Sequence, residues 1–175
     1  FGNAGTYEAR IGHFPMVLPW RDGLLERLSA AWGAGFTPVL PCLWDEAGHL
    51  SARARVAYMD LVSRLYAECF SRPIGDWCRA HGVRYIGHVV EDNGAHARLG
   101  YGAGHFFRAL SGQDASGFDL VYQVWPGHAE GRYLTPFGDL DARFFSWGIA
   151  KLASSAAHID PLKSGTTACE IFGAY

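Results

Sequence analysis

Apolar residues along this chain follow two spacings, one typical of helices and one typical of buried strands. At helical spacing they recur through 21–32, 51–82 and 144–158, which predicts a helix in each range. Ser51 is expected to cap the second helix, and Pro73 is expected to kink or restart it. Short apolar runs bounded by glycine, proline or acidic turns predict strands at 36–43, 83–90, 118–125 and 166–172.

The alternation of apolar strands with helices predicts a parallel α/β sheet with polar residues gathered at the carboxyl ends of the strands. No GxGxxG or GxxxxGK[ST] motif follows any predicted strand, which favours a (β/α)8 barrel over a doubly wound nucleotide-binding sheet. A complete barrel takes about 250 residues, so this chain would cover about four or five of its eight units. We therefore expect residues 1–175 to be part of a single catalytic barrel, truncated at both ends.

Composition narrows the classes of partner. The chain has 175 residues, of which 49% are hydrophobic and 18% charged, with a net charge of -2, as in a globular protein with one sizeable core. Its only lysines are Lys151 and Lys163, and the arginines are scattered, so no basic stripe predicts nucleic-acid binding. No apolar run approaches the roughly 18 residues of a membrane span. The four cysteines form no CxxC pair, which favours buried free thiols over disulfides or zinc.

Three glutamates occupy the ends of predicted strands. Glu91 follows 83–90, Glu170 lies late in 166–172, and Glu8 lies near the end of a first strand. A carboxylate in an apolar strand is costly unless it faces a polar cavity or an ionic partner. Because the carboxyl ends of parallel strands share one edge of a sheet, the three glutamates predict an acidic cleft, the alternative being separate buried ion pairs.

Two carboxylates that converge on a cleft are what glycoside hydrolysis requires. We assign Glu91 as the general acid and Glu170 as the general base, or as a residue that positions water. Glu8 is expected to bind a sugar hydroxyl or to assist the base. Other side chains near the same strand ends are expected to contact the substrate: His88, Asp92, Trp125 and His158.

Two other chemistries fit the sequence less well. His88, Glu91 and His96 suggest a metal site, but their spacing is not HExxH and they do not lie on a predicted helix. Ser154 and Ser155 precede His158, yet they lie within a predicted helix and no GxSxG motif is present. Neither pattern displaces the paired carboxylates, and no metal ligands are assigned.

Several motifs resemble the central barrel of family 106 α-L-rhamnosidases and related multidomain glycosidases. The most specific likeness is Lys151-Leu-Ala-Ser-Ser-Ala-Ala-His158 followed by Ala168-Cys-Glu-Ile-Phe172, which is similar to the family's Ala-Ser-x-Ala-His helix and Ala-Glu-x-Phe strand. Trp77-Cys78 followed by Ile86-Gly-His-Val-Val-Glu91 resembles the segment that carries a strand-end glutamate.

The amino-terminal part extends this likeness. Its matching segments are Gly5-Thr-Tyr-Glu-Ala-Arg10, Leu18-Pro-Trp-Arg-Asp22, Trp32-Gly-Ala-Gly-Phe36 and Val39-Leu-Pro-Cys-Leu-Trp44. The chain departs from the family at Gly35-Phe36-Thr37, where Gly-Tyr-Asp is usual, and in the loop 92–104.

The resemblance implies an inverting hydrolase that acts on an oligosaccharide or polysaccharide. Inversion needs room for a water molecule, so the carboxyl groups of Glu91 and Glu170 would lie about 6.5–9.5 Å apart. The family also implies a calcium requirement, for which no ligands are matched here, and further domains in a longer chain. A non-catalytic sugar-binding barrel and a metal-dependent barrel hydrolase that uses His88 and His96 remain the alternatives.

Overall fold

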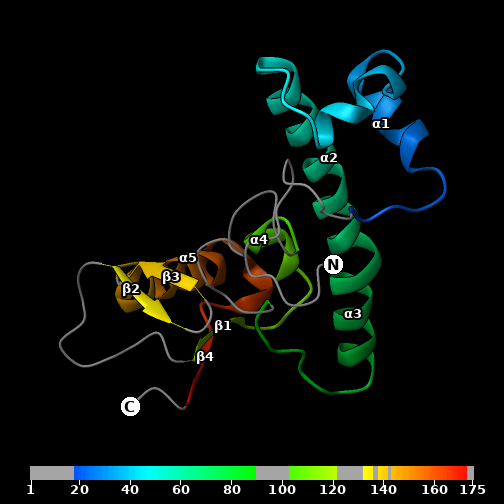
Figure 1. The fold of residues 1–175 in the computed structure, drawn as a ribbon. Coiled ribbons are helices and arrows are strands. Elements are labelled where there is room, and N and C mark those ends of the chain that lie inside the picture. The colour runs from blue at the N-terminus through cyan, green and yellow to red at the C-terminus, as the bar shows by residue number, and fades with distance from the viewer. Residues whose placement is uncertain (1–17, 90–102, 122–131, 136–137, 142, 173–175) are drawn as a thin grey trace.

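A computed structural model describes residues 18–89, 103–121, 132–135, 138–141 and 143–172 of this mixed α/β protein (Figure 1). The helices are α1 (Leu24–Trp32), α2 (His49–Tyr66), α3 (Arg72–Ala80), α4 (Phe106–Ala109) and α5 (Ile149–Ile159). The strands are β1 (Ser116–Val121), β2 (Arg132–Thr135), β3 (Gly138–Asp141) and β4 (Thr167–Phe172). Short 3₁₀ or π turns complete the order: η1 (Thr37–Leu43), η2 (Ala67–Ser71), η3 (Phe144–Gly148) and η4 (Pro161–Lys163).

The amino-terminal region is helical, and the predicted strand at 36–43 is wrong. Thr37–Leu43 forms the 3₁₀ helix η1, in which the Val39 N–H donates to the Phe36 carbonyl at 3.0 Å. Pro38 and Pro41 cannot donate to a strand ladder, which excludes the segment from the middle of a sheet. Part of the apolar run packs into the core formed with α1 and α2, where Phe36 and Leu43 are fully enclosed.

One long helical rod, made of α2, η2 and α3, corresponds to the predicted helix at 51–82 (Figure 1). The π turn η2 directly precedes Pro73, where it accommodates the missing N–H and the bulk of the proline ring. Ser51 does not cap the rod, because the helix begins after Gly48. The buried Ser51 hydroxyl holds the preceding loop, accepting from the Ala47 N–H at 2.7 Å and donating to the Asp45 carbonyl at 2.8 Å.

Two hydrophobic clusters lie along this rod. The first packs α1 and η1 against the apolar face of α2 between Ala54 and Leu65, around Leu28 and Tyr58. The second packs α5 and α4 against β1, with Tyr66 of the rod at its margin. Arg108 of α4 ties the second part to α2 through an ion pair with Asp60 at 2.7 Å. Within the part of the chain described, no helix has the length and apolar character needed to cross a membrane.

The strands β1 and β4 are parallel neighbours, as the sequence predicts for 118–125 and 166–172. Their register pairs Asp119 with Glu170, and α5 lies between the two strands in the sequence. The segment 83–89 passes beside β1 without forming a strand, while residues 122–125 of the predicted range lie outside the described residues. Along the chain, β1 and α5 are separated by an antiparallel pair of strands, β2 and β3, which the sequence pattern does not predict.

Backbone segments touch directly where α3 meets the turn after α4. A Cβ atom on Gly75 would lie 1.9 Å from the Gly112 carbonyl oxygen, and a Cβ atom on Gly112 would lie 2.0 Å from the Ser71 carbonyl oxygen. The buried Ser71 hydroxyl accepts a hydrogen bond from the Gly112 N–H at 3.1 Å. Only glycine permits this approach, which places α3 against the chain that leads into β1.

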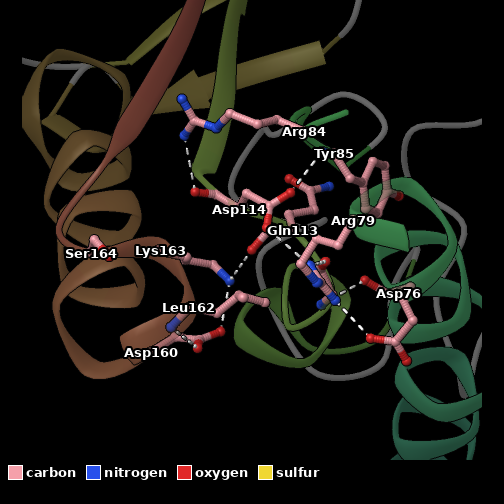
Figure 2. A network of polar contacts seen from close by, with 12 residues as sticks. Asp76, Arg79, Arg84, Tyr85, Gln113, Asp114, Asp160, Leu162, Lys163 and Ser164 are labelled. Atoms are coloured by element: carbon pink, nitrogen blue, oxygen red, sulfur yellow. Dashed lines mark hydrogen bonds and ion pairs between the residues drawn. The ribbon is translucent and has the colours of Figure 1, made fainter. Parts of the chain in front are cut away.

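A network of polar side chains joins α3 to the amino ends of β1 and β4 (Figure 2). Asp114 accepts hydrogen bonds from the Tyr85 N–H at 2.8 Å and from the Arg79 guanidinium at 2.9 Å. Burial raises the pKa of Asp114, but these two donors outweigh it and hold the pKa below its ordinary value. The charged carboxylate therefore stabilises the fold.

We expect Asp114→Asn to lower the free energy of unfolding by about 1–3 kcal/mol at neutral pH, because Arg79 loses its buried ionic partner. The lowered pKa means that the stabilisation by Asp114 is complete above the unfolded-state pKa of about 3.9 and is lost as the pH falls through the folded-state pKa. Urea denaturation at pH 7 and below pH 4 should therefore show the two proteins converging in acid. Asp76→Asn is the control, since its carboxyl also binds Arg79 but is 76% exposed. A loss as large as that of Asp114→Asn in this control would contradict the prediction.

Candidate active site

Three polar side chains from distant parts of the sequence meet across the parallel pair. Asp119 lies on β1 and Glu170 at the matching position of β4, so both side chains lie on the same face. A Cβ atom on Gly117, which shares that face of β1, would lie 1.9 Å from the Gly87 carbonyl oxygen. The glycine at 117 thus lets segment 83–89 approach the strand and brings His88 to the two carboxylates.

The imidazole of His88 lies between the carboxylates. Its Nε2 atom is 3.3 Å from Oε2 of Glu170, and its Nδ1 atom is 3.9 Å from Oδ1 of Asp119. Nδ1 also lies 2.6 Å from the Val89 carbonyl oxygen. Both ring nitrogens therefore face oxygen atoms, and only the protonated ring can donate to both sides.

Exposure differs sharply across these three groups. The Asp119 side chain is 7% exposed, whereas the Glu170 side chain is 53% exposed. His88 connects a carboxylate in the interior with one that meets solvent. The buried Asp119 can orient the imidazole, while the Glu170 carboxylate remains accessible to water or a ligand.

The structure brings together two of the predicted site residues, His88 and Glu170. It does not bring His158 to them. The exposed His158 lies near the carboxyl end of α5, with Nδ1 2.7 Å from the Ser154 carbonyl oxygen, and its Nε2 atom approaches Gly165 ahead of β4. This is the amino end of the parallel pair, whereas Glu170 lies toward the carboxyl end of β4. The other predicted site residues, namely Glu8, Glu91, Asp92 and Trp125, lie outside the described residues.

Asp119 is the site residue that the sequence analysis missed. A signal was present, because Asp119 interrupts the apolar run of β1 just as Glu170 interrupts that of β4. The cost of burying a carboxylate applies more strongly to Asp119, which is the more buried of the two. Asp119 lies near the beginning of the predicted strand 118–125, so a search at the carboxyl ends of strands did not select it.

Possible metal ligands and the cysteines can be compared with what the sequence predicts. Among the described residues, no three His, Cys, Asp or Glu side chains gather in a way that could hold a metal ion, so these residues do not fit the calcium site that the resemblance implies. No disulfide joins the four cysteines, all of which lie within the described residues. Burial of the thiols, expected from the sequence, holds for Cys42 but is wrong for Cys69 and Cys169, which are exposed.

Comparisons with protein families, curated proteins and solved structures find no match to this chain. The geometry of Asp119, His88 and Glu170 is therefore the basis on which a function is proposed.

Proposed function

We propose that this chain is part of a glycoside hydrolase whose catalytic domain is a (β/α)8 barrel, with Glu170 as the general base and Glu91 as the general acid. The observation that carries the proposal is the contact between Glu170 and His88, on the same face of the sheet as Asp119, which pairs with Glu170 in the strand register. In support of the barrel, β1, α5 and β4 form one parallel strand–helix–strand unit.

The neighbours of Glu170 suit a general base. A base must be ionised and must reach a water molecule, and the half-exposed Glu170 carboxylate meets the second condition. The His88 Nε2 atom, 3.3 Å from Oε2 of Glu170, can orient this carboxylate toward a water molecule. Glu170 would then take a proton from water as the water oxygen attacks the anomeric carbon.

The remaining steps rest on residues beyond the described ranges. Glu91 would give its proton to the departing glycosidic oxygen, which balances the proton that Glu170 takes up. Glu8, Asp92 and Trp125 would contact the sugar. The motif resemblance supplies the finer proposal of an inverting, rhamnosidase-like enzyme that acts on an oligosaccharide or polysaccharide within a longer chain. No step is assigned to calcium.

The proposal can be tested by comparing how Glu91→Gln changes the hydrolysis of two substrates with different leaving groups. Loss of a general acid matters most when the leaving group is poor, so we expect disaccharide hydrolysis to fall by about 10²- to 10⁴-fold. Hydrolysis of a 4-nitrophenyl α-L-rhamnoside should fall much less, because nitrophenolate leaves without a proton. Reducing-sugar release and nitrophenol absorbance measure the two rates.

Glu68→Gln, which removes an exposed glutamate of η2, is the control and should leave both rates unchanged. Wild-type protein that is retained on a saccharide matrix but turns over neither substrate would be a binding module. A wild-type rate that disappears when metal is chelated and returns with zinc would instead favour the metal-dependent hydrolase.

A further inference from the structure

A polar cavity lies at the opposite end of the parallel pair from Glu170. Its volume is about 390 Å³, and its walls include residues that immediately precede β1 and β4, among them Asp114, Lys163 and Thr166. In Figure 2, Arg84 and Lys163 extend toward this region from opposite sides of Asp114. Neither the strand-end carboxylates nor the proposed hydrolysis uses this cavity.

One cation at the cavity has no carboxylate in direct contact among the described residues. Arg79 is paired with Asp76 and Asp114, and Lys163 is paired with Asp160 at 2.7 Å. Arg84, by contrast, donates to a neutral group, the Asp114 backbone carbonyl, at 3.2 Å. Among the described residues, the Arg84 guanidinium therefore has no directly bound carboxylate, and most of its five N–H donors remain available.

Lys163 provides an independent sign of a built site. Its side chain is 1% exposed, and its ammonium group donates to the Gln113 carbonyl at 2.9 Å and to Asp160. An ammonium group has three N–H donors, and these contacts use two of them. The remaining N–H donor, in the wall of a polar cavity, can bind an oxygen atom of a ligand.

The rest of the lining indicates which kind of anion. Thr166 and Ser164 add hydroxyl groups, while Val83 and Leu162 present exposed aliphatic surface. Arg84 is the arginine of this lining that has no directly bound carboxylate among the described residues, and a guanidinium binds a carboxylate through two parallel hydrogen bonds. We propose that this cavity binds the carboxylate of a small aliphatic acid, with the carboxylate on Arg84 and the aliphatic part against Val83 and Leu162.

Ligand-observed saturation-transfer NMR on the intact protein tests this proposal, with butyrate as the probe. Butyrate should show saturation transfer, and Arg84→Ala should weaken its binding at least tenfold. Arg72→Ala removes an exposed arginine of α3 away from the cavity and should change nothing. Thr166→Val, a smaller change at an exposed position, should weaken binding less than Arg84→Ala.

Two further probes separate carboxylate recognition from other binding. Butyramide has the same shape without the charge and should not compete with butyrate, whereas inorganic phosphate should compete poorly. If butyramide competed as well as butyrate, the site would recognise only the aliphatic part of the ligand. Phosphate binding stronger than that of butyrate would overturn the carboxylate assignment. Butyrate binding that is unchanged in both Arg84→Ala and Thr166→Val would place the ligand elsewhere and refute the proposal.

Discussion

Replacing Gly112 by alanine is expected to destabilise the protein by about 3 kcal/mol or more, at the upper end of overpacking effects. The added methyl group would lie 2.0 Å from the Ser71 carbonyl oxygen and 2.6 Å from the Arg72 backbone nitrogen. Both obstacles belong to the backbone of the helical rod, so a change of side-chain rotamer cannot relieve the overlap. The turn must move, and the hydrogen bond from the Gly112 N–H to Ser71 is then lost.

Urea denaturation of the variant measures this loss, and Gly35→Ala is the matched control. A Cβ atom on Gly35 would meet nothing within 4 Å, and the residue does not require a positive φ. We expect Gly35→Ala to leave stability within about 1 kcal/mol of the wild type or to raise it slightly. A Gly112→Ala protein as stable as this control would show that the two segments separate easily.

The second large effect is expected on activity. Glu170→Gln keeps the size of the side chain but removes the base, so hydrolysis should fall by about 10²- to 10⁴-fold. In contrast to Glu91→Gln, the loss should be similar for the disaccharide and for the nitrophenyl glycoside, because attack by water is impaired with either leaving group. Initial rates with both substrates give the comparison.

His88→Phe separates the role of the imidazole from that of the carboxylate. It removes the group that lies 3.3 Å from Glu170 while leaving the carboxylate in place, so we expect a smaller loss than in Glu170→Gln. A Glu170→Gln variant that retains wild-type rates with both substrates would remove Glu170 from the mechanism.

The predicted helices are confirmed where periodicity extends over many residues. The ranges 21–32, 51–82 and 144–158 correspond to α1, the rod and η3 with α5, because an apolar stripe of that length suits a helix packed on a core. The apolar run 36–43 is too short for periodicity to distinguish a strand from a helix, and its prolines favour the observed 3₁₀ helix. Run length alone cannot separate a short strand from a short buried helix.

The site was predictable only in part, because strand neighbours are decided by tertiary packing. Glu170 and His88 were chosen as polar residues near strand ends, and the structure brings them into contact. The third partner, Asp119, became visible once the register of β1 and β4 was known. His158 was misplaced because α5 runs back along the strands, so its carboxyl end lies at the opening residues of β4.

The helical rod also bears on how the molecule folds. The two hydrophobic clusters have no member in common, yet both contact the same continuous helix, and Arg108 adds a cross-link to it. Two separate cores joined by a shared helix unfold cooperatively as long as that helix remains intact. The turn η2, where regular α-helical hydrogen bonding is interrupted, contributes Ser71 to the contact with Gly112, and Asp60, which binds Arg108, lies before it on α2. The region of the second core is therefore held by the rod before, within and after η2, so opening of that single turn would not by itself release one core from the other.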